Sequence, residues 1–311
     1  MNAQLDLLVV GSVALDTIET RMAARTEVLG GSASYFSAAS SFLTSVGLVA
    51  VVGDDFPEEH AGFLTGLGVD TQGLEQRPGK TFRWHGRYSE DFNNRTSLDT
   101  QLNVFAGFEP KLHPAHADAR LVFLGNIDPA LQLRVLDQMK RVELVGLDTM
   151  NFWINGSREA LLQVLRRVDF LLLNDEEARL LSGRHNLVLA AQAIQRLGPK
   201  NVVVKRGDAG ALLFHDEHVF AAPALPLTDV VDPTGAGDSF AGGFMGYLSR
   251  MWRGGTLDGM SVRRAMICGS TMAGFCCEDF SLDRFRQLNH EIIDSRFRAF
   301  RHLTHFEDLV L

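Results

Sequence analysis

Apolar segments of strand length recur along this chain, and amphipathic helical patterns lie between most of them. The strand-like segments cover residues 5–13, 46–53, 119–127, 143–149, 169–174, 201–207 and 210–214. Helical patterns occupy residues 157–167 and the series Leu187, Ala190, Ile194 and Leu197, which repeats at spacings of three and four. This alternation predicts an α/β fold, in which a mostly parallel central sheet carries helices on both faces. Ligands of such sheets bind at the carboxyl ends of the strands.

One region departs from this alternation. From residue 80 to residue 108 polar and aromatic side chains alternate without a helical period, which predicts antiparallel strands with one exposed face. Residues 16–29 can add a strand or loop beside them, and a β-hairpin excursion without a role is the plain alternative. No internal repeat, low-complexity tract or Pro-rich linker divides the chain. We therefore expect residues 1–311 to form a single domain.

Composition and charge narrow the class of partner. The net charge of −8 and the pI near 5.7 argue against a general nucleic-acid or anionic membrane surface. The first residues lack a basic region before an apolar stretch, and no apolar run is long enough to span a bilayer, so we expect a cytoplasmic protein. Cys268, Cys276 and Cys277 have neither disulfide-framework nor zinc-site spacing. A small molecule is the expected partner, with neither nucleic acid nor membrane.

The most informative motif lies between residues 229 and 240. Gly235, Ala236 and Gly237 directly precede Asp238, and a run of small and apolar residues follows to Leu248. This pattern predicts a glycine-rich loop that opens into a helix, whose first N–H groups lack intrahelical partners and favour an anion such as phosphate. Asp238 then stands where a carboxylate could take the proton of a hydroxyl that attacks this phosphate. Ordinary capping chemistry at a helix start is the alternative.

The segment from Asp232 to Asp238 closely resembles the second signature of the PfkB, or ribokinase-like, family of carbohydrate and nucleoside kinases. Pro233 stands where the family usually has threonine. Other family segments follow in the expected order: the strand that leads to Asp16, the pair Gly30-Gly31, and residues 46–56, 147–153, 171–177 and 202–210. The resemblance implies a ribokinase-like three-layer fold with a small β lid over the substrate, formed here by about residues 16–29 and 80–108.

The resemblance also implies a function. It suggests an ATP-dependent kinase that transfers a γ-phosphoryl group to a hydroxyl of a sugar, with Asp238 as general base and the backbone of Gly235, Ala236 and Gly237 as the anion hole. Asp16 matches the residue that accepts hydrogen bonds from sugar hydroxyls. The substrate-binding residues implied by the resemblance are Asp16, Gly30, Gly31, Tyr35 and Asp238, although Tyr35 stands where the family often has asparagine.

Cofactor positions follow from the same resemblance. Asn174 and Glu177 match the pair that organises Mg²⁺, through water, beside the ATP phosphates, while an N-cap with an acidic first turn is their plain alternative. The residues implied around the nucleotide are Lys205, Gly207, Gly210, Thr234 and Gly237. Asp232 matches a position whose surroundings bind a monovalent cation, K⁺ in some relatives. Asp148 and Asn151 match a further segment, in which Trp153 replaces the usual arginine.

Three alternatives stay open. Tyr35, Phe36, Trp84 and Phe105 could stack on a base and favour a ribonucleoside kinase, or they could be lid core. A catalytically idle relative that binds nucleotide or sugar is the second alternative. A dehydrogenase is the third, but residues 11–16 lack the Gly-x-Gly-x-x-Gly that it needs. An exposed lid edge could also pair across a two-fold axis and form a homodimer.

Overall fold

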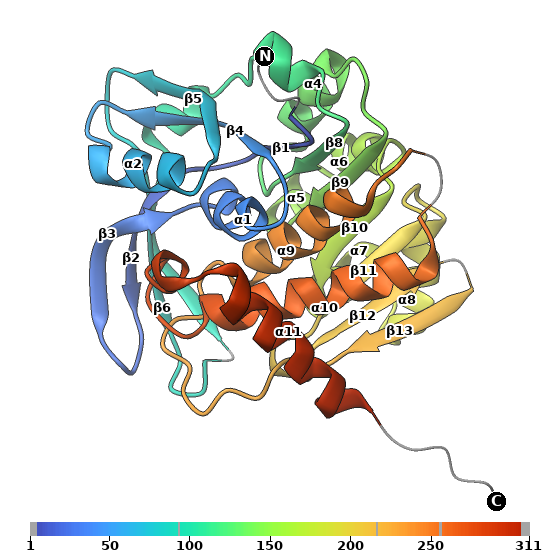
Figure 1. The fold of residues 1–311 in the computed structure, drawn as a ribbon. Coiled ribbons are helices and arrows are strands. Elements are labelled where there is room, and N and C mark those ends of the chain that lie inside the picture. The colour runs from blue at the N-terminus through green and yellow to red at the C-terminus, as the bar shows by residue number, and fades with distance from the viewer. Residues whose placement is uncertain (1–4, 93, 216, 255–256, 306–311) are drawn as a thin grey trace, which may run out of the picture.

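The computed structural model describes residues 5–92, 94–215, 217–254 and 257–305. These residues form two sheets, one large and one small, with helices packed on the large one (Figure 1). No helix within these ranges is both long and apolar enough to cross a bilayer.

The large sheet has nine strands among the described residues, in the order β13-β12-β11-β10-β9-β8-β1-β4-β5. The strands are β1 (Leu7–Val10), β4 (Val46–Gly53), β5 (Asp70–Arg77), β8 (Leu121–Leu124), β9 (Leu144–Asp148), β10 (Phe170–Asn174), β11 (Asn201–Lys205), β12 (Ala211–His215) and β13 (His218–Ala222). Neighbours from β5 to β11 pair in parallel, while β12 and β13 are antiparallel. The predicted strands are confirmed, and β5 and β13 are two edge strands that the apolar pattern did not predict.

Helices cover both faces of the large sheet and create two apolar cores. Leu7 and Val9 of β1 belong to one core, and Leu8 and Val10 to the other, as the alternation of side chains along a strand requires. The first core includes residues of α1 (Ser32–Ser41), α2 (Glu58–Gly66), α9 (Ala236–Met251), α10 (Gly259–Cys276) and α11 (His290–Thr304). The second includes residues of α4 (Pro129–Gln138), α5 (Asn151–Gly156), α6 (Arg158–Leu165), α7 (Asp175–Ser182) and α8 (Leu187–Gln195). The three-layer α/β architecture is therefore confirmed.

Shorter helical elements complete the chain. These are α3 (Pro114–Ala117) and the 3₁₀ turns η1 (Asn103–Gly107), η2 (Gly207–Ala209) and η3 (Arg284–Gln287).

Helix α9 is held rigidly between α1 and α10. A Cβ atom on Gly242 would lie 2.4 Å from the carbonyl oxygen of Phe36 in α1, and one on Gly243 would lie 2.7 Å from the carbonyl oxygen of Cys268 in α10. Glycine therefore permits both neighbouring backbones to approach closely. The small-residue run expected after Asp238 is a tightly packed helix, and this packing fixes the position of its N-terminus.

The small sheet has the strand order β3-β2-β6-β7, formed by β2 (Ala14–Glu19), β3 (Ala24–Gly30), β6 (Phe82–Tyr88) and β7 (Arg95–Gln101). The pairs β2–β3 and β6–β7 are antiparallel, as expected for the 80–108 region. The pair β2–β6 is parallel, because two hairpins from distant parts of the chain meet side by side in the same direction. Strand β7 is exposed along its whole length.

Candidate active site

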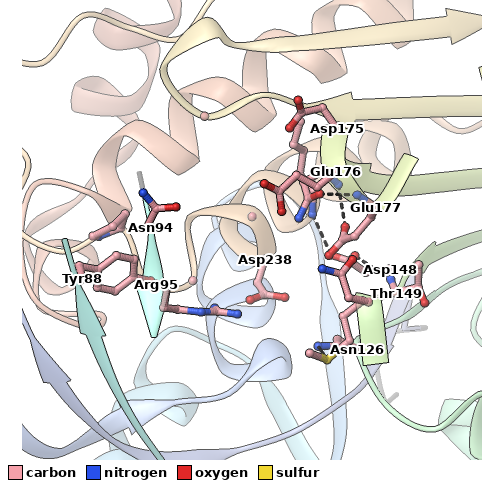
Figure 2. A pocket seen from close by; sticks show the side chains of 18 residues that line it. Tyr88, Asn94, Arg95, Asn126, Asp148, Thr149, Asp175, Glu176, Glu177 and Asp238 are labelled. Atoms are coloured by element: carbon pink, nitrogen blue, oxygen red, sulfur yellow. Dashed lines mark hydrogen bonds and ion pairs between the residues drawn. The ribbon is translucent and has the colours of Figure 1, made fainter. Parts of the chain in front are cut away.

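A cavity of about 560 Å³ lies at the carboxyl ends of β9, β10 and β11. Its wall combines residues after these strands with the first turn of α9 and with residues around the start of β7 in the small sheet (Figure 2). Because parallel strands end at the same edge of a sheet, segments more than 50 residues apart in the chain converge there. The cavity thus occupies the place where an α/β sheet binds its ligands.

The entrance to α9 requires glycine. Gly235 is the residue before the helix and has φ = +76°, and a Cβ atom there would lie 2.3 Å from the ring of Tyr35. Gly235 and Gly237 line the cavity. A Cβ atom on Gly237 would lie 3.2 Å from Nζ of Lys205, so the first turn of α9 and the Lys205 ammonium face the same space. The N–H of Ala236 donates to the carbonyl of Pro233 at 3.1 Å, and Ala236 serves the turn itself.

Asp238 projects into the cavity from the first turn of α9 (Figure 2). Burial and the negative charge of Asp148 raise the pKa of its carboxyl from 3.8 to about 7, against the opposing effects of Lys205 and Arg95. A carboxyl group with a pKa near neutrality can both accept and release a proton at physiological pH. The carboxylate therefore has the properties of a general base.

Lys205 is fixed beside this carboxylate by an ion pair. Its Nζ lies 2.9 Å from Oδ2 of Asp148, which is buried at the end of β9. Burial lowers the pKa of Lys205, but the carboxylates of Asp148 and Glu177 outweigh burial and raise it overall. Lys205 is therefore held as a cation at the cavity wall.

Asn174 and Glu177 form a capping box at the start of α7. Oδ1 of Asn174 accepts the N–H of Glu177 at 2.8 Å, and Oε2 of Glu177 accepts the N–H of Asn174 at 2.7 Å. Both residues line the cavity together with Asp175 and Glu176. Burial, with a smaller contribution from Asp148, raises the pKa of Glu177 to about 7. The capping interpretation is confirmed, and it leaves this acidic edge turned toward the cavity.

The start of α7 offers carboxylate and amide oxygens, the type of ligand that Mg²⁺ prefers. No group of three or more His, Cys, Asp or Glu side chains within the described ranges is arranged to hold a metal ion. Mg²⁺ usually keeps several waters and is held by one or two carboxylates together with substrate phosphates. The acidic edge at the start of α7 fits a magnesium ion bound mainly through phosphate and water.

Asp16 lies on β2, is buried, and is not among the described residues that line the cavity. A Cβ atom on Gly30 would lie 1.9 Å from Oδ2 of Asp16, so the carboxylate fits only beside a glycine. Gly31 has φ = +92°, and a Cβ atom there would lie 2.5 Å from the carbonyl oxygen of Ser12. Burial raises the pKa of Asp16 to about 8, with further contributions from Asp232 and Asp238. Its buried Oδ1 has no hydrogen-bond partner among the described residues. An unpaired buried acceptor of this kind is suited to a donor from a ligand hydroxyl.

The aromatic side chains considered for a base are mostly packed. Tyr35 is 1% exposed and does not line the cavity, because its ring lies against Gly235. Phe36 is fully buried and stacks on Phe123 at 4.5 Å. Phe105 stacks on Phe82 and on Phe108, and Trp84 is half-buried beneath the guanidinium of Arg95. The packing favours a structural role for Tyr35, Phe36 and Phe105.

The loop before α9 is pinned by Asp232. This fully buried carboxylate accepts the N–H of Thr234 at 2.8 Å and the N–H of Ser281 at 3.2 Å. The hydroxyl of Thr234 donates to the hydroxyl of Tyr88 on β6 at 3.2 Å, which ties the small sheet to this loop.

The two glycines after β11 differ in role. Gly207 lines the cavity. Gly210 lies at the turn into β12 with φ = +77°, and a Cβ atom there would lie 2.2 Å from the carbonyl oxygen of Ala222. Gly210 is therefore required by the turn, and it does not line the cavity.

Sequence similarity decides which family the chain belongs to. Residues 3–284 match the pfkB family carbohydrate kinases. The chain belongs to this family. It is 32% identical to the cytidine kinase of Thermococcus kodakarensis over 251 residues, which cover 79% of this chain and 89% of that protein. As a pfkB family member it is a kinase, a phosphotransferase with a hydroxyl acceptor, that acts within the range of sugars and nucleosides.

Solved structures agree with the fold of this pfkB kinase. The ribokinase of Giardia lamblia superposes with a TM-score of 0.78 at 17% identity, covering 96% of this chain and 100% of that one. A chain from E. coli described as ribokinase II, in complex with ATP and Mg²⁺, superposes with a TM-score of 0.73 at 18% identity, covering 95% of this chain and 99% of that one. At these identities the likeness establishes the ribokinase fold, with its small additional sheet.

Several cavity residues of this pfkB kinase were not found from its sequence. Tyr88, Asn94 and Arg95 come from the small sheet, and Asn126 follows β8. Oδ1 of Asn126 accepts the indole N–H of Trp153 at 2.9 Å, at the position where the family usually has arginine. A polar residue two positions after the end of a buried strand was a usable signal for Asn126. The exposed strand β7 carries no motif that singles out Arg95.

Proposed function

We propose that this protein is an ATP-dependent kinase that transfers the γ-phosphoryl group to a hydroxyl of a sugar or sugar-containing small molecule, with Asp238 as general base. The observation that supports this most strongly is the position of Asp238: it projects from the N-terminus of α9 into the cavity, and its pKa is raised to about 7. Phosphoryl transfer needs an aligned hydroxyl, a base for its proton and positive or dipolar groups for the phosphoryl oxygens.

In this proposal Asp238 accepts the proton of the acceptor hydroxyl. The acceptor oxygen bonds to the γ-phosphorus, the bond from that phosphorus to the β-phosphate oxygen breaks, and ADP leaves. The backbone at Gly235, Gly237 and Asp238 stabilises the phosphoryl oxygens at the positive end of the α9 dipole. The unpaired Oδ1 of Asp16 holds an acceptor hydroxyl, and Gly30 leaves the room that its carboxylate needs.

ATP and Mg²⁺ are assigned to the open side of the cavity. Lys205 and Gly207 would contact the nucleotide phosphates, and Thr234 would shape the loop beneath them. Asn174 and Glu177 would orient Mg²⁺ through water at the acidic edge. When bound, Mg²⁺ would neutralise charge on the phosphates. The ATP and Mg²⁺ held by the E. coli neighbour support this assignment.

A ribonucleoside is the second candidate acceptor. The likeness to the cytidine kinase favours it, and a nucleoside presents the same kind of ribose hydroxyl to Asp16 and Asp238. The packed state of Tyr35, Phe36 and Phe105 speaks against those rings as the platform for a base. Tyr88, half-buried at the cavity wall, is an aromatic side chain that a base could contact instead.

Several further assignments stay predictions. We expect residues 1–311 to act as a single catalytic domain, with the small sheet serving as a lid. A homodimer formed through this sheet, which light scattering would detect, and a cytoplasmic location also stay predictions. The K⁺ site predicted near Asp232 is tested by the dependence of the rate on K⁺. Asp232 already anchors two backbone N–H groups, so its replacement would disturb the loop with or without K⁺.

The test is an acceptor panel assayed with ATP and Mg²⁺. Ribose, myo-inositol, cytidine and adenosine are compared, with ADP production as the readout, for the wild-type protein and for Asp238→Asn. We expect turnover of at least one acceptor, and a fall in kcat of about 10²–10⁴-fold in Asp238→Asn with ATP binding retained. Equal turnover by Asp238→Asn would exclude this residue as the base. ATP binding without turnover of any acceptor would favour the alternative in which this protein binds nucleotide or sugar but does not catalyse phosphoryl transfer.

A further inference from the structure

The charge of the cavity wall is unbalanced for a site that receives a triphosphate. Among the described residues that line it, the acidic side chains are Asp148, Asp175, Glu176, Glu177 and Asp238, and the cationic ones are Arg95 and Lys205. Lys205 is already committed to Asp148 at 2.9 Å. Within the described part of the chain, Arg95 is therefore the cation of the cavity wall that forms no ion pair with a carboxylate of the large sheet.

Arg95 reaches the cavity from the small sheet. It is the first residue of β7, and its side chain extends toward the carboxylate of Asp238 (Figure 2). Its guanidinium carbon lies 5.2 Å from the ring centroid of Trp84, and this aromatic face supports the planar group. The guanidinium also lowers the pKa values of Asp238 and Asp16 against the raising effect of their burial.

The neighbouring strand holds this arrangement in place. Tyr88 ends β6, pairs with Arg95 in the sheet register, and accepts a hydrogen bond from the Thr234 hydroxyl at 3.2 Å. The start of β7 is thereby tied to the loop that leads into α9. In this arrangement the guanidinium and the α9 N-terminus face the same part of the cavity.

We infer that Arg95 is a catalytic residue, which the small sheet brings to the phosphoryl group in transit. Its guanidinium binds oxygens of that group as the acceptor oxygen bonds to the γ-phosphorus, the bond to ADP breaks and Asp238 takes the proton. This inference rests on the proposed role of Asp238. Arginine suits the task because its planar fork offers paired donors to phosphoryl oxygens and stays charged at any physiological pH.

Closure of the small sheet would then complete the site electrostatically. With the small sheet away, Asp238 would face Asp148 and Lys205 without the second cation. With the sheet in the position seen here, the positive charges of both Lys205 and Arg95 act on Asp238. Arg95 would thus couple closure of the sheet to phosphoryl transfer.

The experiment compares wild-type protein with Arg95→Ala, Arg95→Lys and the control Arg87→Ala. Arg87 is an exposed arginine of the same sheet, paired with Glu19 at 2.6 Å and not part of the cavity wall. Two measurements are made. Steady-state kinetics give kcat and KM on the acceptor panel, and calorimetry gives the affinity for ADP in the presence of Mg²⁺, with and without fluoroaluminate. Fluoroaluminate imitates the phosphoryl group in transit and needs no knowledge of the acceptor.

Arg95→Ala should lower kcat by about 10²–10³-fold and abolish the gain in ADP affinity from fluoroaluminate, with affinity for ADP alone changed less than about threefold. Arg95→Lys should recover part of kcat and part of the fluoroaluminate gain in ADP affinity, and Arg87→Ala should match wild type in both measurements. Wild-type kcat and a full fluoroaluminate gain in Arg95→Ala would overturn the inference and leave the proposed function intact. A change confined to KM for the acceptor would also overturn it. If wild type phosphorylates no acceptor in the panel, the proposed acceptor class fails, while the fluoroaluminate measurement still decides the role of Arg95.

Discussion

Replacement of Asp238 by asparagine should stabilise the folded protein, by an amount that grows as pH rises from about 4 to 7 and is constant above that range. The folded-state pKa is raised from 3.8 to about 7, so between these values the folded protein holds a proton that the unfolded chain releases. Stability of the wild type therefore falls as pH rises through this range and stays lower above it. The shift corresponds to about 4 kcal/mol, and partial exposure of Asp238 reduces the expected effect to about 2–4 kcal/mol above pH 7.

Urea unfolding of wild type and Asp238→Asn at a series of pH values measures this difference. The gain in unfolding free energy of Asp238→Asn should be close to zero near pH 4, grow through pH 5 and 6, and level off above about pH 7. Asp258→Asn is the matched control, because this substitution should change the unfolding free energy in the opposite direction. Asp258 caps α10, accepting the N–H of Ser261 at 2.7 Å and its hydroxyl at 2.9 Å, and these bonds lower its pKa. Asp258→Asn should lose stability once pH exceeds this lowered pKa. If the unfolding free energy of Asp238→Asn does not exceed that of wild type, or exceeds it by the same amount from pH 5 to 9, the raised pKa of Asp238 is refuted.

Two glycine substitutions at the entrance to α9 should have different effects. Gly235→Ala should destabilise the fold by about 2–4 kcal/mol in urea unfolding, because the alanine would adopt φ = +76° and meet the ring of Tyr35 at 2.3 Å. Gly237→Ala should keep wild-type stability and still lower kcat by about tenfold or more, because its Cβ would contact only the side chain of Lys205, at 3.2 Å from Nζ, and would intrude on the phosphate position. Wild-type stability in Gly235→Ala, or wild-type kcat in Gly237→Ala, would contradict this account.

The large sheet could be predicted because its inner strands are buried on both faces. Segments such as Val46–Gly53 and Phe170–Asn174 are continuous apolar runs, which only a covered parallel sheet explains well. The edge strand Asp70–Arg77 was missed, since half-exposed edges tolerate polar residues and show no such run. His218–Ala222, at the opposite edge, was missed for the same reason.

The candidate site was predictable where the chain itself carries the geometry. Asp238 follows its glycines directly, and the capping box of Asn174 and Glu177 is local to one helix start. Arg95 could not be predicted, because it reaches the cavity through the pairing of β2 with β6, strands about 60 residues apart, and local sequence does not encode the partner or direction of such a pair. Tyr35 was considered for substrate binding because it follows Gly30-Gly31 in the sequence. In the structure its ring is buried against Gly235, and the local sequence does not encode this long-range contact.

The pH dependence of kcat/KM tests the central claim most directly, namely that the carboxylate at the start of α9 removes the acceptor proton. The wild-type value should rise with pH through about 7 and then level off, because only the ionised form of Asp238 can accept a proton. Glu177 also has a pKa of about 7, so the same profile is measured for Asp238→Asn by single-turnover kinetics. We predict that the rising limb disappears in this variant along with most of the rate. If Asp238→Asn keeps a rate comparable to wild type and that rate still rises with pH through about 7, the claim that Asp238 removes the acceptor proton is contradicted.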